Sequence, residues 1–248
     1  MPWAGEPLHT TLHSSPGSVV YEARLPYGRA TALHAHTGVT AYVVVTAPVT
    51  PAGTPAPVTT ETVEWEVDEA SGGVFAASLV RGEMVLTPGA AFAFVVDDPT
   101  RPLVHRLITP PEGAGPLAVR VVGVEVRRRR GGGLPGEGDP GPPPPFALAA
   151  AGPGFRILRL ILDVGARATP PPLAPGSVLV TVRGGEGLVD DGDKGGGKGC
   201  GGAPPSPFVA AATAPSDGVL VVGNEQLAGS SLMNAGRGVY EVAVVELT

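Results

Sequence analysis

Short segments rich in valine, threonine and aromatic residues recur along the whole chain, and glycine or proline bounds most of them. Apolar residues seldom recur three and four positions apart, as they would in a helix. Side chains at every second position of a strand face the same side of a sheet. The strand-like segments are 19–25, 41–46, 62–67, 73–80, 84–87, 91–96, 104–109, 117–126, 155–162, 178–182, 207–212, 218–222 and 239–247. The pattern predicts an all-β protein.

Two stretches hold much of the glycine and proline, 131–145 and 192–207. We interpret the first as a Gly/Pro-rich linker and the second as a long loop. The linker separates an N-terminal domain, 1–130, from a C-terminal domain, 146–248. Both are long enough to bury a core of their own.

The two halves also resemble each other when the chain is shifted by 137 residues. Gly28 then falls on Gly165, and residues 42–45 fall on 179–182. Two copies of one β unit predict sandwiches or small barrels, because an antiparallel sheet must close or pair to cover its apolar face and its edges.

Charge and composition exclude several classes of partner. A formal net charge of −6 argues against binding to nucleic acid or to anionic lipid. No run of 18 to 20 uncharged apolar residues could cross a membrane. The single cysteine, Cys200, forms no intramolecular disulfide, and the first residues show no export pattern, so we expect a cytoplasmic protein.

All five histidines lie within the first 105 residues. His34 and His36 are two positions apart, so a strand would place both rings on one face, close enough to share one ion. His105, in the strand-like segment 104–109, is the candidate third ligand. His9 and His13 are interpreted as surface residues.

At this point the chain resembles the cupin superfamily of jelly-roll barrels. Gly28, His34 and His36 match the first motif, but Thr40 or Ala41 stands where the family has a glutamate. Gly82 and Pro88 match the start of the second motif, whose glycine is displaced to Gly89. His105 matches its histidine, and Thr109 replaces its usual asparagine. The resemblance covers most of residues 18–126 and implies a metal site made by the three histidines.

The second half resembles the same fold without the site. Gly165 and Gly184 are in place, but the histidine positions fall on Pro171 and Leu173, and the glutamate position falls on Ser177. Residues 218–247 also look like the C-terminal lobe of type I phosphomannose isomerases, which carries no zinc ligands. The resemblance therefore implies a bicupin, with two jelly-roll barrels of which one binds metal.

Three neutral imidazoles leave a divalent ion its full charge, which favours a small anionic ligand that chelates it. Some cupins have three-histidine iron sites, among them cysteine dioxygenase and the diketone-cleaving enzymes. The resemblance to them implies a non-haem Fe²⁺ dioxygenase. Fe²⁺ is favoured, and Zn²⁺, Mn²⁺ and Ni²⁺ stay open. We expect metal affinity to weaken below about pH 6.5, where free imidazole protonates.

Two further residues are candidates near the site. Arg120 shares a strand face with Val122 and Val124, and the pattern predicts that this face is buried. A buried guanidinium needs an anion beside it. Arg120 is therefore a candidate catalytic residue that orients the substrate. Glu83, near the second motif, is a candidate replacement for the missing carboxylate.

Other functions stay open at this stage. The barrel could be a non-catalytic binding or structural protein, or a relative of the sugar-phosphate isomerases. The sequence leaves open whether the chain is an enzyme. A homodimer is expected only by analogy with the fold.

Overall fold

The computed structural model describes residues 3–68, 70–71, 73–96, 98, 100–127, 144–169, 171, 173, 176–184, 187–190, 218–221, 231–234 and 236–247. The chain divides into two compact units, Met1–Gly131 with Gly152–Gly154, and Gly132–Ala151 with Phe155–Thr248. Apart from the short 3-10 helix η1 (Trp3–Gly5), the regular elements of the described residues are strands, so the all-β prediction is confirmed. No described helix is long and apolar enough to cross a membrane.

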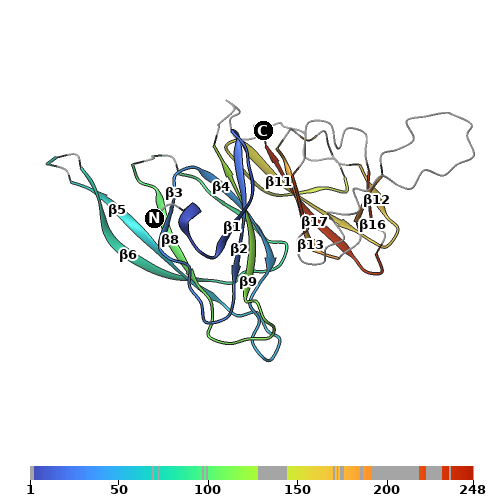
Figure 1. Cartoon of the computed structure of the whole chain (residues 1–248), viewed down its shortest axis with the longest axis horizontal. Coiled ribbons are helices and arrows are strands. Elements are labelled where there is room, and N and C mark those ends of the chain that lie inside the picture. Colours follow the sequence, from blue (N-terminus) through green and yellow to red (C-terminus); the bar gives the residue numbers. More distant parts are fainter. Residues whose placement is uncertain are drawn as a thin grey trace, which may run out of the picture. The chain divides into compact units, whose positions relative to one another are not determined.

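The first unit consists of two antiparallel sheets (Figure 1). One has the order β1-β2-β9-β4-β7, with β1 (His9–Ser14), β2 (Ser18–Leu25), β9 (Val119–Val126), β4 (Val39–Thr46) and β7 (Ala91–Phe94). The other has the order β3-β8-β5-β6, with β3 (His34–His36), β8 (Leu103–Ile108), β5 (Val58–Val67) and β6 (Val74–Met84). The chain alternates between the sheets from β2 to β5 and again from β6 to β9, which is the topology of a jelly roll.

Alternation along the strands places the core of this unit between its sheets. β-branched residues are frequent in β2, β4 and β9, where they pack well on a pleated surface. Every second residue of these strands faces the interior. The buried core residues are Val19, Tyr21, Ala23, Leu25, Tyr42, Val44, Val58, Leu86, Ala118, Val119 and Val121.

Gly123 in the middle of β9 lets an aromatic ring fit into this core. A Cβ at this position would lie 2.3 Å from Cζ of Tyr21 and 2.6 Å from its hydroxyl oxygen. The Tyr21 ring therefore lies directly over the backbone of β9, where no larger residue fits.

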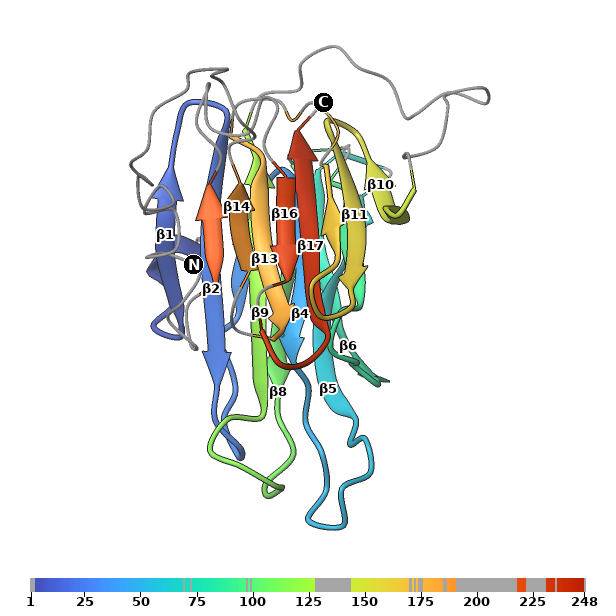
Figure 2. The same ribbon diagram turned by 90° about the vertical axis from the view of Figure 1, so that its right-hand side faces the viewer.

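The described part of the second unit has a closely similar strand order, which Figure 2 shows in part. Its first sheet is β10-β11-β17-β13-β15, with β10 (Ala147–Gly152), β11 (Phe155–Leu162), β17 (Tyr240–Leu247), β13 (Val178–Arg183) and β15 (Val219–Val221). Its second sheet is β12-β16-β14, with β12 (Arg167–Ala168), β16 (Ser231–Asn234) and β14 (Gly187–Asp190). β11-β17-β13-β15 corresponds to β2-β9-β4-β7, and β16-β14 corresponds to β8-β5. β12 corresponds to residues 30–31, which bridge to β8 just before β3 begins.

The register relates the two units residue by residue. β11 begins and ends 137 residues after β2, and the turns that follow contain Gly28 and Gly165 at φ values of 70° and 76°. Leu25 pairs with Val119, and Leu162 pairs with Tyr240, so positions of β9 and β17 correspond with a shift of 121.

Some details of the sequence-based prediction change. The segment 84–87 is not a strand of its own, because β6 runs on through Gly82 and ends at Met84. Five strands were not predicted: β1, β10, β12, β14 and β16. Residues 131–143 of the proposed linker, the loop 192–207 with Cys200 and the segment 207–212 lie outside the described residues.

Candidate metal centre

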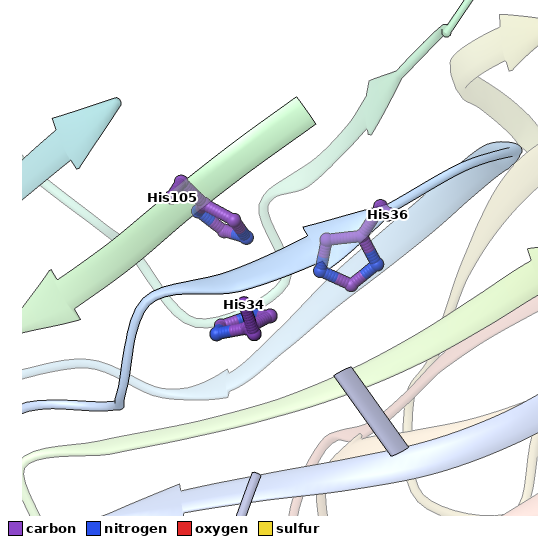
Figure 3. Close-up of side chains that lie close together, drawn as sticks. All are labelled: His34, His36 and His105. Carbon is purple, nitrogen blue, oxygen red and sulfur yellow. The ribbon is translucent and has the colours of Figure 1, made fainter. Parts of the chain in front are cut away.

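The structure brings His34, His36 and His105 together inside the first jelly roll (Figure 3). β3 pairs antiparallel with β8 so that His34 lies directly opposite His105, and His36 follows on the same face of β3. His34 and His36 are 2% and 0% exposed. The candidate ligand nitrogens of the three residues all lie within 4.8 Å of one another.

The hydrogen bonds of the ring nitrogens differ among the three histidines, and for His34 they indicate which nitrogen faces the centre of the cluster. His34 Nδ1 lies 2.8 Å from the carbonyl oxygen of Ala32, so it carries the proton and donates to that oxygen. Nε2 of His34 and Nε2 of His105 are buried and have no hydrogen-bond partner among the described residues. His36 Nε2 lies 3.1 Å from the hydroxyl of Tyr42, which accepts a hydrogen bond from Tyr21, so an ion bound at this nitrogen would replace Tyr42 as its partner.

Buried nitrogen lone pairs without a partner cost free energy in the folded state. A divalent transition metal would satisfy them, since imidazole is a preferred ligand of such ions. The donor set and its spacing thus fit a metal ion.

Burial keeps these imidazoles in the form that binds metal. The pKa of His34 is lowered to about 4 and the pKa of His105 to about 3, mainly by burial and in smaller part by the neighbouring histidines. The rings are therefore neutral at pH 7. Proton competition for these two ligands begins well below pH 6.5, lower than the free imidazole value suggests.

A cavity of about 50 Å³ adjoins the cluster. Its walls are mainly aliphatic and aromatic, and no Lys, Arg, Asp or Glu is among the described residues that line it. The lining residues are His9, Ala23, Leu25, Thr31, His34, Tyr42, Thr60, Met84, Leu86, Phe92, Phe94, His105, Leu107 and Val121. An ion at the histidines would be the main source of charge for a ligand here.

His9 is not a surface residue, contrary to the sequence-based interpretation. Its side chain is 5% exposed, lines the cavity, and packs edge-on against His34 with ring centroids 4.8 Å apart. Nδ1 of His9 donates to Glu6 over 2.7 Å. Glu6 also accepts a hydrogen bond from the backbone N–H of Ala32, whose carbonyl oxygen orients His34. No sequence signal indicated this arrangement, since η1 and β1 lie far from β3 along the chain.

Arg120 does not join the cluster. It lies on the face of β9 opposite the cavity, where its guanidinium pairs with Glu22 of β2. The anion that its burial requires is thus supplied by the protein. Glu83 is exposed on β6 and supplies no carboxylate to the histidines.

Sequence reasoning missed two residues beside His36. Tyr42 lies on the inward face of β4, and Glu125 lies on the inward face of β9 with its Oε2 3.8 Å from His36 Nδ1. The alternation of β9 already places Glu125 on the same face as Val121. The register that brings it next to His36 is a property of the folded sheet.

Comparisons with known proteins give only distant likenesses. No protein-family model matches the chain, and no curated protein sequence does. Similar solved structures include a cupin 2 conserved barrel domain protein from Leptotrichia buccalis, with 10% identity, coverage of 97% of this chain and 88% of that one, and a TM-score of 0.44.

AerE from Microcystis aeruginosa gives 8% identity, coverage of 98% of both chains and a TM-score of 0.47. Oxalate decarboxylase from Bacillus subtilis, a protein with Mn(II) centres, gives 11% identity, coverage of 96% of this chain and 72% of that one, and a TM-score of 0.48. Cupin-domain proteins are thus among the similar structures, while the fold assignment itself rests on strand order and register.

Proposed function

We propose that the chain is a metal-binding bicupin whose first barrel holds one divalent ion through His34, His36 and His105. The observation that carries the proposal is the convergence of three imidazoles, those of His34 and His36 fully buried, from two paired strands beside a cavity. The second barrel has Pro171 and Leu173 at the corresponding sequence positions, and neither residue binds metal.

The finer proposal is a non-haem Fe²⁺ dioxygenase that acts on a small anionic molecule. Three histidines leave further coordination positions open, whereas a purely structural ion is usually enclosed by four protein ligands. When bound, the ion supplies a Lewis acid for the anionic end of the substrate and the one-electron chemistry that dioxygen requires. Zn²⁺, Mn²⁺ and Ni²⁺ fit the same three ligands.

The residues around the cavity define the rest of the substrate. Phe92, Phe94 and Leu86 form apolar walls that exclude water and favour an apolar body. A second anionic group would be buried there without a cation, which costs several kcal/mol. The preferred molecule is therefore small, with one chelating anionic end, such as an enolate with a neighbouring oxygen.

The same walls disfavour the sugar-phosphate alternative. A sugar phosphate brings several hydroxyl groups and a dianion, and no basic residue is among the described residues around the cavity. Arg120, the basic residue suggested by the sequence, pairs with Glu22 on the other face.

Metal analysis and oxygen uptake test the proposal. Purified protein is expected to contain about one divalent ion per chain, and Fe²⁺-loaded protein is expected to consume oxygen with simple β-diketones. Metal without oxygen uptake across diketones and thiols would leave a non-catalytic metal-binding barrel. Absence of metal after reconstitution with Fe²⁺, Mn²⁺, Zn²⁺ and Ni²⁺ would refute the site itself.

A homodimer in the cytoplasm belongs to the same proposal. Light scattering on the purified full chain measures its mass and distinguishes a dimer from a monomer. A monomeric mass would refute the proposed dimer and would leave the proposed metal site unaffected.

A further inference from the structure

A buried carboxylate lies beside the histidine cluster without belonging to it. Glu125, on β9, is 8% exposed and faces the interior with Val121 and Gly123. Its Oε2 lies 3.8 Å from His36 Nδ1, the ring nitrogen opposite the one near Tyr42. Glu125 therefore reaches His36 from a sheet different from the one that carries the histidines.

The environment of this carboxylate is unusual among the buried glutamates. Glu125 Oε2 is buried and has no hydrogen-bond partner among the described residues. Thr40, directly opposite on β4, has a buried hydroxyl that also lacks one. A carboxylate oxygen left in this state destabilises the fold.

The second unit shows how the same position is satisfied elsewhere. Glu246 of β17 corresponds to Glu125, and it accepts two hydrogen bonds from the guanidinium of Arg156, at 3.0 Å and 2.7 Å. The position of Arg156 is occupied in the first unit by Val19, which pairs with Glu125 across the strands. The first unit thus keeps the carboxylate, Glu125, but has no arginine in the place of Arg156. The ring of His36 lies beside Glu125 instead.

We propose that Glu125 is a positioning residue of the metal centre, which accepts a hydrogen bond from Nδ1–H of His36 when Nε2 of that ring binds the ion. This inference rests on the proposed metal site. A carboxylate bound to the outer nitrogen of a ligating histidine fixes the ring orientation and makes the ring a stronger ligand. It also offsets one of the two positive charges that three neutral imidazoles leave on the ion.

The geometry fits this role. A metal on Nε2 withdraws electron density from the ring, so Nδ1–H becomes a stronger donor. Shortening the contact from 3.8 Å to hydrogen-bond length needs a shift of about 1 Å, which rotation about the side-chain bonds of Glu125 provides. Metal binding and the new hydrogen bond therefore support each other.

The position of Thr40 adds a second reason. The sequence has Thr40 or Ala41 where the motif it resembles has a glutamate, and Thr40 pairs across the sheet with Glu125. A carboxylate thus reaches this region of the barrel from β9 in place of β4, and acts on His36 through the ring.

Metal titration of three full-length proteins tests the inference: wild type, Glu125→Gln and Thr40→Val. Zn²⁺ affinity is expected to fall about 10- to 100-fold in Glu125→Gln, the usual cost of losing such a partner. Thr40→Val, a matched change in the same buried pair, is expected to keep wild-type affinity. Without metal, Glu125→Gln is expected to unfold at the same or higher urea concentration, which separates positioning from a structural role.

A measurement on the wild type needs no variant to fold. Nitrogen-15 NMR of the Zn²⁺-loaded wild type is expected to show the His36 proton on Nδ1, in a strong hydrogen bond. A His36 ring protonated on Nε2, or equal Zn²⁺ affinity of wild type and Glu125→Gln, would overturn the role of Glu125. Failure of the wild type itself to bind metal would instead refute the proposed function.

Discussion

The interiors of the two units differ at corresponding positions of corresponding strands. Tyr21 and Tyr42 of the first unit correspond to Leu158 and Leu179 of the second, all of them buried. Gly123, which makes room for Tyr21, corresponds to Val244. At these three positions the second interior has aliphatic side chains, whereas the first contains a hydrogen-bonded pair of tyrosine hydroxyls that leads to His36.

In both units a polar side chain holds the turn that follows the first core strand, β2 or β11, through hydrogen bonds to backbone carbonyl oxygens. Thr109 Oγ1 lies 2.8 Å and 2.9 Å from the carbonyl oxygens of Pro26 and Arg29. Asn234, at the same place in the second unit, donates from Nδ2 to the carbonyl oxygens of Leu162 and Gly238. The comparison separates residues that maintain the jelly roll, which both units have, from the histidines of the proposed metal site, which the sequence places in the first unit.

The largest expected effect tests whether the metal belongs to the first unit alone. His34→Ala with His36→Ala removes two of three ligands, so the bound ion is expected to be lost. Leu173→Ala, at the corresponding place in the second unit, is expected to keep the ion. Elemental analysis of the purified proteins measures this, and an ion retained by the double variant would contradict the assignment.

The next effect is a loss of stability of the metal-free first unit in acid. Burial lowers the pKa of His34 and His105 from 6.5 to about 4 and about 3, so the unfolded chain takes up protons first as the pH falls. Stability is therefore expected to fall from pH 6.5 towards pH 4, with a slope approaching two protons, on the order of 2–3 kcal/mol per pH unit.

Tryptophan fluorescence can follow this loss. Both tryptophans, Trp3 and Trp65, belong to the first unit, so urea unfolding monitored by fluorescence reports on that unit. His105→Gln is expected to weaken the pH dependence. A urea midpoint that stays constant between pH 7 and pH 4.5 would show that these rings titrate normally.

A smaller effect tests the difference between Gly123 and Val244. Gly123→Ala places a Cβ against the Tyr21 ring and is expected to destabilise the first unit by about 1–3 kcal/mol. Tyr21→Leu, which copies the second unit, is expected to reduce that cost when the two changes are combined. Urea unfolding of the two single variants and the double variant measures the coupling, and additive costs would mean that the ring does not limit this position.

The smallest expected effect concerns the residue that holds the turn. Thr109→Val removes a hydroxyl that shares one proton between two carbonyl oxygens and accepts a hydrogen bond from the Arg29 N–H, so it is expected to cost about 1–2 kcal/mol. Thr109→Asn, which introduces the residue of the second unit, is expected to cost less. Equal losses for both variants would show that Thr109 and Asn234 hold their turns in different ways.

Much of this molecule follows from local sequence pattern. Period-two alternation predicted most of the strands, since the side-chain direction in a strand depends only on the local backbone. The same rule placed His34 and His36 on one face. Arg120 was placed correctly on the face of Val122 and Val124, but its partner was not found, because Glu22 lies 98 residues away along the chain and meets it only through β2–β9 pairing.

The sequence by itself determined the strand class, the turn glycines and the three histidines that form the cluster. Tertiary structure alone decided what surrounds them: the Glu6–His9 pair, the tyrosine hydroxyls and the carboxylate of Glu125. The physical reason is register. The residues that lie opposite each other depend on the alignment of two paired strands that are distant in sequence. Burial of the whole interior sets that alignment.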